Sequence, residues 1–223
     1  MSILKTTYKD NKFLTQDDIE ALESEEDKYY YEVYTLGNWG ILGAVIFKNW
    51  HTEDISELIP TFDKCKNGLD FGFAHDPAAL AVTHYDKKKK TIYIFDEIYE
   101  TELTNDVLAS AVKKKIHSEY VVCDSSEPKS IKELKRHGLN SIGAKKGRDS
   151  VNHGIQWLQQ QKVIIHTKCI NSINEFQQYK WKEDKNGNVL KVPVDKDNHL
   201  IDALRYAYED EMKFRIKPIM ARI

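Results

Sequence analysis

The chain has 223 residues, enough to bury the core of one domain with some residues to spare. Its formal net charge of -2 excludes the uniformly basic surface of a protein that coats nucleic acid without local organisation, so any DNA site must be a local patch. Charged residues make up 30% of the sequence, and it has neither an apolar run long enough to cross a bilayer nor an opening export signal, so we expect a cytoplasmic protein with no membrane function.

The first part of the chain predicts a connector followed by strands. Residues 1–50 mix acidic helical stretches with a tyrosine-rich segment and show no core-like pattern. From Lys66 onward, hydrophobic residues alternate with small or acidic ones, which predicts a strand. Residues 80–85 and 91–99 predict two more strands joined by a lysine-rich hairpin turn. Together they form an antiparallel three-strand meander.

The second part alternates between helical and strand-like segments. Helices are expected at residues 105–115, 129–137, 151–161, 168–178 and 199–212, and short strands at 120–123, 141–144 and 163–166. A meander followed by alternating helices and strands is typical of an α/β fold with a mixed sheet flanked by helices.

A polar hairpin is predicted before the last helix. Asn186-Gly187 favours a two-residue type I′ turn, and counting outward pairs Trp181 with Val192 and Lys182 with Lys191. One face of this hairpin is apolar and is expected to lie on the domain. Like charges across a strand pair are destabilising, so the basic face is expected to meet DNA phosphates beside the metal site. A mobile surface ribbon is the alternative.

Three aspartates occupy positions where the local pattern predicts no charge. Asp70 stands between two glycines of the first strand, which suggests space for a metal ion and a phosphate. Asp124 follows a buried strand, at the edge where open α/β sheets bind ligands. Asp202 lies near the start of the last helix, beside its apolar stripe. All three are candidate site residues.

Converging carboxylates without basic partners would repel one another, so divalent cations are expected to neutralise them. Oxygen ligands favour Mg²⁺ or Mn²⁺, and two such ions suit phosphodiester hydrolysis. Taken one by one, the aspartates also fit structural roles. Asp70 could cap a turn, Asp124 could open an Asx turn and Asp202 could be a first-turn helix acid.

Four segments carry a more specific pattern. They are Gly68-Leu69-Asp70-Phe71-Gly72-Phe73, Asp124-Ser125-Ser126-Glu127-Pro128, Lys146-Gly147-Arg148-Asp149-Ser150 and Asn198-His199-Leu200-Ile201-Asp202. In this order they resemble motifs of the C-terminal nuclease domain of the large terminase subunit of tailed double-stranded DNA bacteriophages. The resemblance spans about residues 25–212.

This resemblance implies an RNase H-like fold and a metal-dependent endonuclease that cuts concatemeric double-stranded DNA during genome packaging by two-metal hydrolysis. It implies that Asp70, Asp124 and Asp202 bind Mg²⁺ or Mn²⁺ and, with His199, form the catalytic site. Residues 1–60 would link to an ATPase domain, 61–215 would form the nuclease domain, and 216–223 a C-terminal tail. The sequence has no phosphate-binding loop, so no ATPase activity is expected of it. The implied partners are double-stranded DNA, the ATPase domain, the portal protein and the small terminase subunit, in the host cytosol.

Further candidates surround these motifs. Asp76 and Glu127 could be extra metal ligands, although turn roles fit them equally well. Glu97 could be a ligand if its strand lies beside Asp70, and His75 could be a ligand or base, although an exposed loop histidine is the commoner case. Basic side chains expected to contact phosphates, or else to form a solvated face, are Lys129, Lys145, Lys146, Arg148, Lys180, Lys182 and Lys191. Two alternatives stay open: an RNase H-like nuclease of the resolvase or transposase type, and a non-catalytic DNA-docking module.

Overall fold

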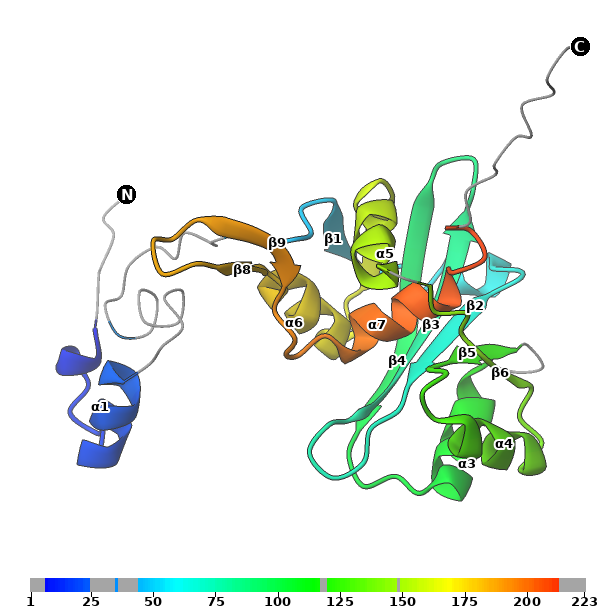
Figure 1. The fold of residues 1–223 in the computed structure, drawn as a ribbon, viewed down its shortest axis with the longest axis horizontal. Coiled ribbons are helices and arrows are strands. Elements are labelled where there is room, and N and C mark those ends of the chain that lie inside the picture. Colours follow the sequence, from blue (N-terminus) through cyan, green and yellow to red (C-terminus); the bar gives the residue numbers. More distant parts are fainter. Residues whose placement is uncertain (1–6, 25–34, 36–43, 117–119, 148, 213–223) are drawn as a thin grey trace, which may run out of the picture. The chain divides into compact units, whose positions relative to one another are not determined.

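The computed structural model describes residues 7–24, 35, 44–116, 120–147 and 149–212 (Figure 1). The chain forms two compact units, residues 1–45 and 46–223. In the first unit, a short 3₁₀ helix (η1, Tyr8–Asp10) precedes helix α1 (Gln16–Glu23). Thr15 begins α1 with a capping box, because its hydroxyl accepts the backbone N–H of Asp18 at 3.2 Å. Arg148 and the expected 216–223 tail lie outside the described residues.

The second unit contains a seven-stranded sheet, as far as the described residues go, in the order β1-β7-β4-β3-β2-β5-β6 (Figure 1). Its strands are β1 (Trp50–Glu53), β2 (Lys66–Asp70), β3 (Ala78–Asp86), β4 (Thr91–Glu100), β5 (Val121–Cys123), β6 (Ser141–Gly143) and β7 (Lys162–His166). Strands β2, β3 and β4 pair antiparallel, and the other pairs are parallel. The predicted meander and mixed sheet are therefore confirmed.

Helices cover both faces of this sheet (Figure 1). Helices α3 (Asn105–Ile116) and α4 (Pro128–Arg136) pack on one face, where Val112 and Leu134 are fully buried. Helices α5 (Ser150–Gln159), α6 (Ile170–Gln178) and α7 (His199–Ala207) pack on the other. The last helix ends five residues before the predicted end at 212. Tyr208 instead turns into the core, where its hydroxyl lies 2.8 Å from Thr83 Oγ1.

Strand β1 was not predicted from the sequence. Its four residues, Trp50–Glu53, are polar or aromatic and mostly exposed, so they lack the alternation that marks a half-buried strand. It pairs in parallel with β7 at the sheet edge. The compact unit thus begins at Ile46, earlier than the domain boundary expected at residue 61.

Gly68 allows helix α7 to pack directly on β2. A Cβ atom at this position would lie 1.7 Å from the Ala203 carbonyl oxygen, a distance that no folded protein tolerates. The sequence suggested that this glycine leaves space for a metal ion and a phosphate. That expectation is wrong, because the backbone of α7 fills the space.

The β8–β9 hairpin forms, but its predicted register is wrong. Strands β8 (Trp181–Glu183) and β9 (Val189–Pro193) pair Trp181 with Pro193 and Glu183 with Val189, with an irregularity between. Gly187 has a φ of 80°, whereas Asn186 is outside the left-handed region that a type I′ turn needs at both central residues.

The turn is longer than predicted because Asp184 organises it. The Gly187 N–H donates to the Asp184 carbonyl at 3.0 Å, and the Asp184 carboxylate accepts N–H groups from Asn186 and Asn188, both at 2.8 Å. The predicted apolar face lies on the domain only at the base of the hairpin: Tyr179 is buried and Trp181 packs against the core, whereas Leu190 and Val192 are exposed.

Candidate active site

Packing of adjacent elements brings the three candidate aspartates to one region of the sheet. Asp70 ends β2, and Asp124 directly follows β5, the parallel neighbour of β2. The Asp124 N–H donates to the Leu69 carbonyl at 2.9 Å, which fixes the two strand ends together. Asp202 lies in the first turn of α7, which packs across both strands. The charges of Asp202 and Asp124 both act on Asp70, raising its pKa.

Asp70 is paired with His199. His199 Nδ1 lies 3.2 Å from Asp70 Oδ2, and its Nε2 lies 3.7 Å from Asp76 Oδ1. Burial is the main cause that raises the pKa of Asp70, and the hydrogen bond with His199 opposes that shift. The same hydrogen bond raises the pKa of His199. The hydrogen bond therefore favours the ionised form of Asp70 and the protonated form of His199.

Asp124 is held by three different donors. Lys146 Nζ lies 2.5 Å from Asp124 Oδ1, and the Ser126 N–H donates to the same oxygen at 2.8 Å. The Tyr206 hydroxyl donates to Oδ2 at 3.3 Å. Burial raises the pKa of Asp124, but the hydrogen bonds from Lys146 and Ser126 outweigh it, so the pKa is lowered. This aspartate both opens an Asx turn and faces the site.

Asp202 is paired with Arg205 on the same helix. Arg205 Nη2 and Nε lie 2.7 and 3.1 Å from Asp202 Oδ1, and the arginine is only 6% exposed. The expectation that the carboxylates converge without basic partners is therefore wrong. Arg205 and Tyr206 were missed as site residues, although they follow Asp202 at i+3 and i+4 and so share its helix face.

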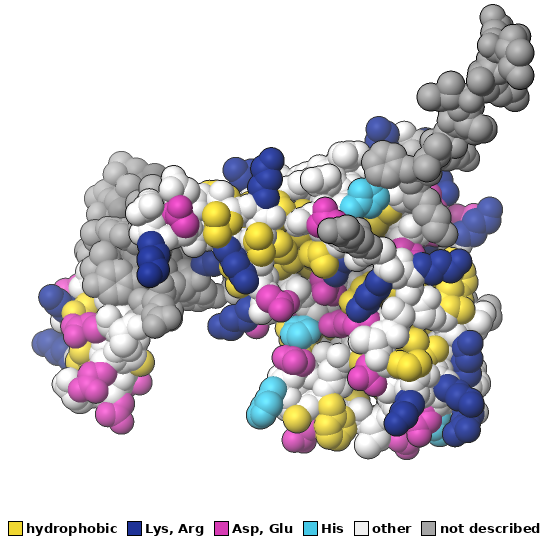
Figure 2. Space-filling model, in the orientation of Figure 1, with side chains coloured by type: hydrophobic (Ala, Val, Ile, Leu, Met, Phe, Trp, Pro, Cys, Tyr) yellow, Lys and Arg dark blue, Asp and Glu magenta, His cyan; other side chains and the backbone are white. Residues whose placement is uncertain are grey.

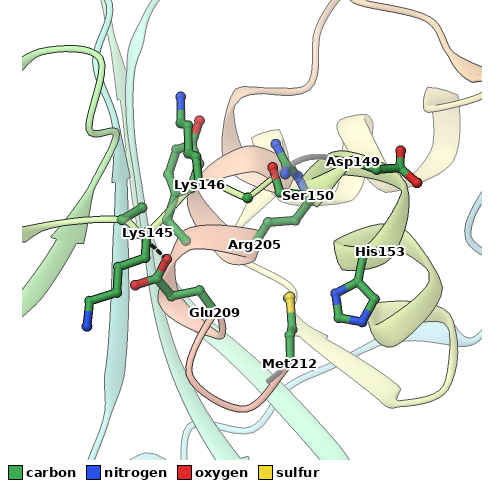
Figure 3. Close-up of a pocket in the computed structure, with 11 residues that line it drawn as sticks. Lys145, Lys146, Asp149, Ser150, His153, Arg205, Glu209 and Met212 are labelled. Carbon is green, nitrogen blue, oxygen red and sulfur yellow. Dashed lines mark hydrogen bonds between the residues drawn. The ribbon is translucent and has the colours of Figure 1, made fainter. Parts of the chain in front are cut away.

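A cavity of about 450 Å³ opens beside Arg205 and Tyr206 (Figure 3). Lys145 and Lys146 line one side of it, and Ser150 and His153 of α5 line the other. A second cavity, of about 550 Å³, borders His199 at the start of α7 and includes His75 and Asp76 among its lining residues. Both ends of α7 thus face hollows in the surface.

The other sequence candidates fall into different places. Glu97 is not directed to Asp70: its carboxylate accepts the backbone N–H groups of Asn171 and Ser172 at 2.9 and 3.0 Å, at the start of α6. Glu127 lines a separate cavity beyond α4 and interacts with Ser130.

Most of the basic candidates lie on the surface. Lys129 is exposed on α4, and Lys180, Lys182 and Lys191 belong to the hairpin or its base. Figure 2 shows basic side chains on the hairpin surface with hydrophobic ones beside them.

The aspartates fit a hard divalent cation in donor type, because they offer carboxylate oxygens near one another and near a histidine. As they stand, no three His, Cys, Asp or Glu side chains within the described part of the chain are arranged to hold a metal. Lys146 and Arg205 supply the positive charge instead. A metal ion would compete with Lys146 and Arg205 for these carboxylates.

Comparison with known proteins identifies the family. The family profile described as Terminase RNAseH like domain matches residues 70–210, more than half of the chain. The chain belongs to this family. It is 41% identical over 220 residues to the terminase large subunit of Bacillus phage SPP1, covering 93% of this chain and 52% of that protein. It is also 28% identical over 214 residues to the PBSX phage terminase large subunit of Bacillus subtilis (strain 168), covering 92% and 49%. The chain therefore spans about half the length of the curated relatives it matches.

Solved structures support the same assignment. The nuclease domain of the SPP1 large terminase, solved with bound Mn, is 40% identical, with a TM-score of 0.70 over 74% of this chain and 98% of that one. The P22 large terminase nuclease domain shares the fold at 21% identity and a TM-score of 0.56, covering 66% and 80%. The large-terminase resemblance and the RNase H-like fold are thus confirmed. Within the described residues, the helices are too short or too polar to cross a bilayer.

Proposed function

We propose that this chain is a divalent-metal-dependent endonuclease that cuts concatemeric double-stranded DNA during genome packaging. The observation that carries the proposal is that Asp70 at the end of β2, Asp124 directly after β5 and Asp202 on α7 come together in a chain of the terminase RNase H-like family. The carboxylates are mostly buried, at 13%, 15% and 21% exposure of their side chains, and the side chains paired with them, His199, Lys146 and Arg205, line the two cavities.

Asp70, Asp124 and Asp202 would hold Mg²⁺ or Mn²⁺, and a pair of such ions would activate a water and stabilise the leaving oxygen of a phosphodiester. The chain's own residues do the rest. His199 orients the Asp70 carboxylate through its Nδ1 and can carry a proton at Nε2, which faces the cavity with Asp76. The Tyr206 hydroxyl fixes the second oxygen of Asp124.

Basic side chains beside the carboxylates would bind the phosphates. Lys145 and Lys146 line the cavity next to Asp124, where Lys146 also lies 5.3 Å above the Tyr206 ring. With metal ions held by the aspartates, Lys146 and Arg205 would be available to phosphate oxygens. We expect these phosphate contacts to be independent of the DNA sequence. The side chains that would make them are Lys129, Lys145, Lys146, Arg148, Lys180, Lys182 and Lys191.

In a longer protein, this domain would act with an ATPase domain, the portal protein and the small terminase subunit in the host cytoplasm. The relatives support this reading, because the chain matches about half of each large terminase subunit. The segment before Ile46 would then be the link toward the ATPase domain. A resolvase or transposase role, or a non-catalytic docking role, has no comparable observation in its favour.

Plasmid cleavage tests the proposal. Supercoiled plasmid is incubated with the protein in Mg²⁺, Mn²⁺ or EDTA, and nicked and linear products are quantified on gels. We expect cleavage with either metal, none in EDTA, and a loss of about a thousandfold or more in Asp70→Asn, Asp124→Asn and Asp202→Asn. Asp63→Asn, at an exposed position outside the site, is the matched control and should cleave normally. Full cutting in EDTA, or by all three variants, would contradict the proposal.

A further inference from the structure

A buried glutamate outside the three aspartates sits at the start of the helix that carries His199 and Asp202. Glu175 lies on α6 and is only 3% exposed. Its Oε1 accepts the backbone N–H of Leu200 at 3.1 Å, and its Oε2 accepts that of Ile201 at 2.9 Å. Each carboxylate oxygen thus accepts a backbone N–H from the first turn of α7.

These bonds replace a cap that α7 does not supply itself. The residue at the N-cap position, Asn198, makes no side-chain capping hydrogen bond. The N–H groups in the first turn of a helix have no partner within the helix, and leaving them buried without acceptors is costly. Burial raises the pKa of Glu175 to about 8, while the N–H groups of Leu200 and Ile201 oppose this shift and the helix dipole favours the ionised form. Glu175 therefore fixes the position and direction of the first turn of α7.

A second carboxylate fixes α6 in the same way. Glu97 of β4 accepts the backbone N–H groups of Asn171 and Ser172, and the Ser172 hydroxyl donates to it at 2.6 Å. The sheet thus holds α6 through Glu97, and α6 holds α7 through Glu175. Figure 1 shows α6 beside α7 on one face of the sheet.

We propose that Glu175 is a positioning residue, which sets the first turn of α7 so that His199 and Asp202 meet Asp70 in the geometry that metal binding needs. His199 is the residue before Leu200, and Asp202 is the residue after Ile201, so the two anchored amides lie between the two site side chains. A shift of this turn would move both side chains together. This inference rests on the proposed function, because it assumes that the aspartates bind metal.

Glu175→Gln tests this role, since the amide has the same shape but only one acceptor oxygen for two N–H donors. Mn²⁺ binding is measured by calorimetry, and kcat and KM by plasmid cleavage, well below the melting temperature of each variant. We expect Mn²⁺ affinity and kcat to fall about tenfold with KM for DNA unchanged, as for other residues that orient metal ligands. Thr83→Val is the control for lost stability, because it removes a fully buried hydroxyl that bonds to Tyr208 and to the Lys66 carbonyl.

The control should lower the melting temperature and leave Mn²⁺ affinity within about twofold of wild type. Glu175→Gln with wild-type Mn²⁺ affinity and kcat, whatever its melting temperature, would overturn the positioning role. Failure of the proposed function looks different: the wild-type protein would then bind no Mn²⁺, or Asp70→Asn would bind it as well as wild type.

Discussion

The carboxylate site and the β8–β9 hairpin are built in opposite ways. At the site, the residues directly before Asp70 and Asp202 in the chain are fully buried, and each of the two carboxylates has a hydrogen-bonded partner. On the hairpin, Lys182 and Lys191 are exposed, and neither makes an ion pair with another described residue. Metal chemistry needs fixed ligands, whereas contact with a phosphate backbone tolerates mobile cations.

The two regions also differ in how deeply their apolar residues are buried. Leu200 and Leu204 of α7 are buried against the sheet, while Val189, Leu190 and Val192 of the hairpin are exposed. A two-stranded ribbon has little core of its own, so its order depends on what it contacts. The comparison predicts that substitutions under α7 affect folding and metal binding together, while those on the hairpin affect DNA binding alone.

The largest effect is expected for Gly68→Ala, which disturbs the packing of α7 against β2 at the carboxylate site. The added methyl group would overlap the Ala203 carbonyl, so α7 must move away from β2 and carry His199 and Asp202 with it. We expect a loss of about 4 kcal/mol or more, as for severe overpacking, and a melting temperature lower by roughly 10 °C. Thermal unfolding followed by circular dichroism measures this. Gly147→Ala is the control, because nothing lies within 4 Å of its position, and a similar loss in both variants would contradict the packing argument.

Much of the carboxylate site and of the elements around it was predictable from the sequence. Asp124 was predicted at the end of a buried parallel strand because the apolar run before it is short and continuous, and the structure places it there. Helix α3 was predicted over residues 105–115 from the spacing of its apolar residues, and in the structure it ends one residue later. In both cases a strong local pattern and the tertiary packing favour the same structure.

What the sequence did not predict depends on contacts between distant residues. Lys146 lies 22 positions after Asp124 in the chain, and its ion pair with that carboxylate exists only because β6 pairs with β5. The anchoring of α7 by Glu175 likewise needs α6 to pack beside it. The hairpin register failed for a different reason, since the Asp184 side chain stabilises a longer turn than Asn186-Gly187 alone would favour.

A smaller effect is expected at Lys146, which pairs with Asp124 and is proposed to contact a DNA phosphate. Lys146→Met keeps much of the side chain's length and removes its charge, so Asp124 loses the cation that competes with metal. We expect Mn²⁺ affinity to rise about threefold to fivefold, because a partly exposed ion pair contributes up to roughly 1 kcal/mol. Plasmid cleavage should fall at the same time, since a phosphate contact is lost. Calorimetry and cleavage assays measure both, with the exposed Lys129→Met as control for the metal affinity. Unchanged or weaker Mn²⁺ binding would contradict the competition.

The smallest effect is expected at the hairpin. Its predicted register no longer supports contact with DNA, but the exposure of its lysines still does. Lys182 and Lys191 both lie within the irregularity between the pairs Trp181–Pro193 and Glu183–Val189, so the predicted direct pairing of the two lysines is not observed. Their exposure beside the chain that leads into α7 still favours contact with DNA. Lys182→Glu combined with Lys191→Glu should weaken DNA binding and reduce its salt dependence.

The size of that change follows from counterion release. Each phosphate contact contributes about 0.9 to the slope of log affinity against log salt concentration, so losing two should flatten the slope by roughly two units. The matched control is Lys88→Glu combined with Lys114→Glu, which changes the net charge equally at exposed positions on the β3–β4 turn and on α3. Because the control has the same overall charge, only a local contact can make the two slopes differ. Metal affinity should stay at the wild-type value in both variants, since neither pair touches the aspartates. Equal slopes in the hairpin variant and the control would show that the hairpin is a solvated ribbon and that DNA is held elsewhere.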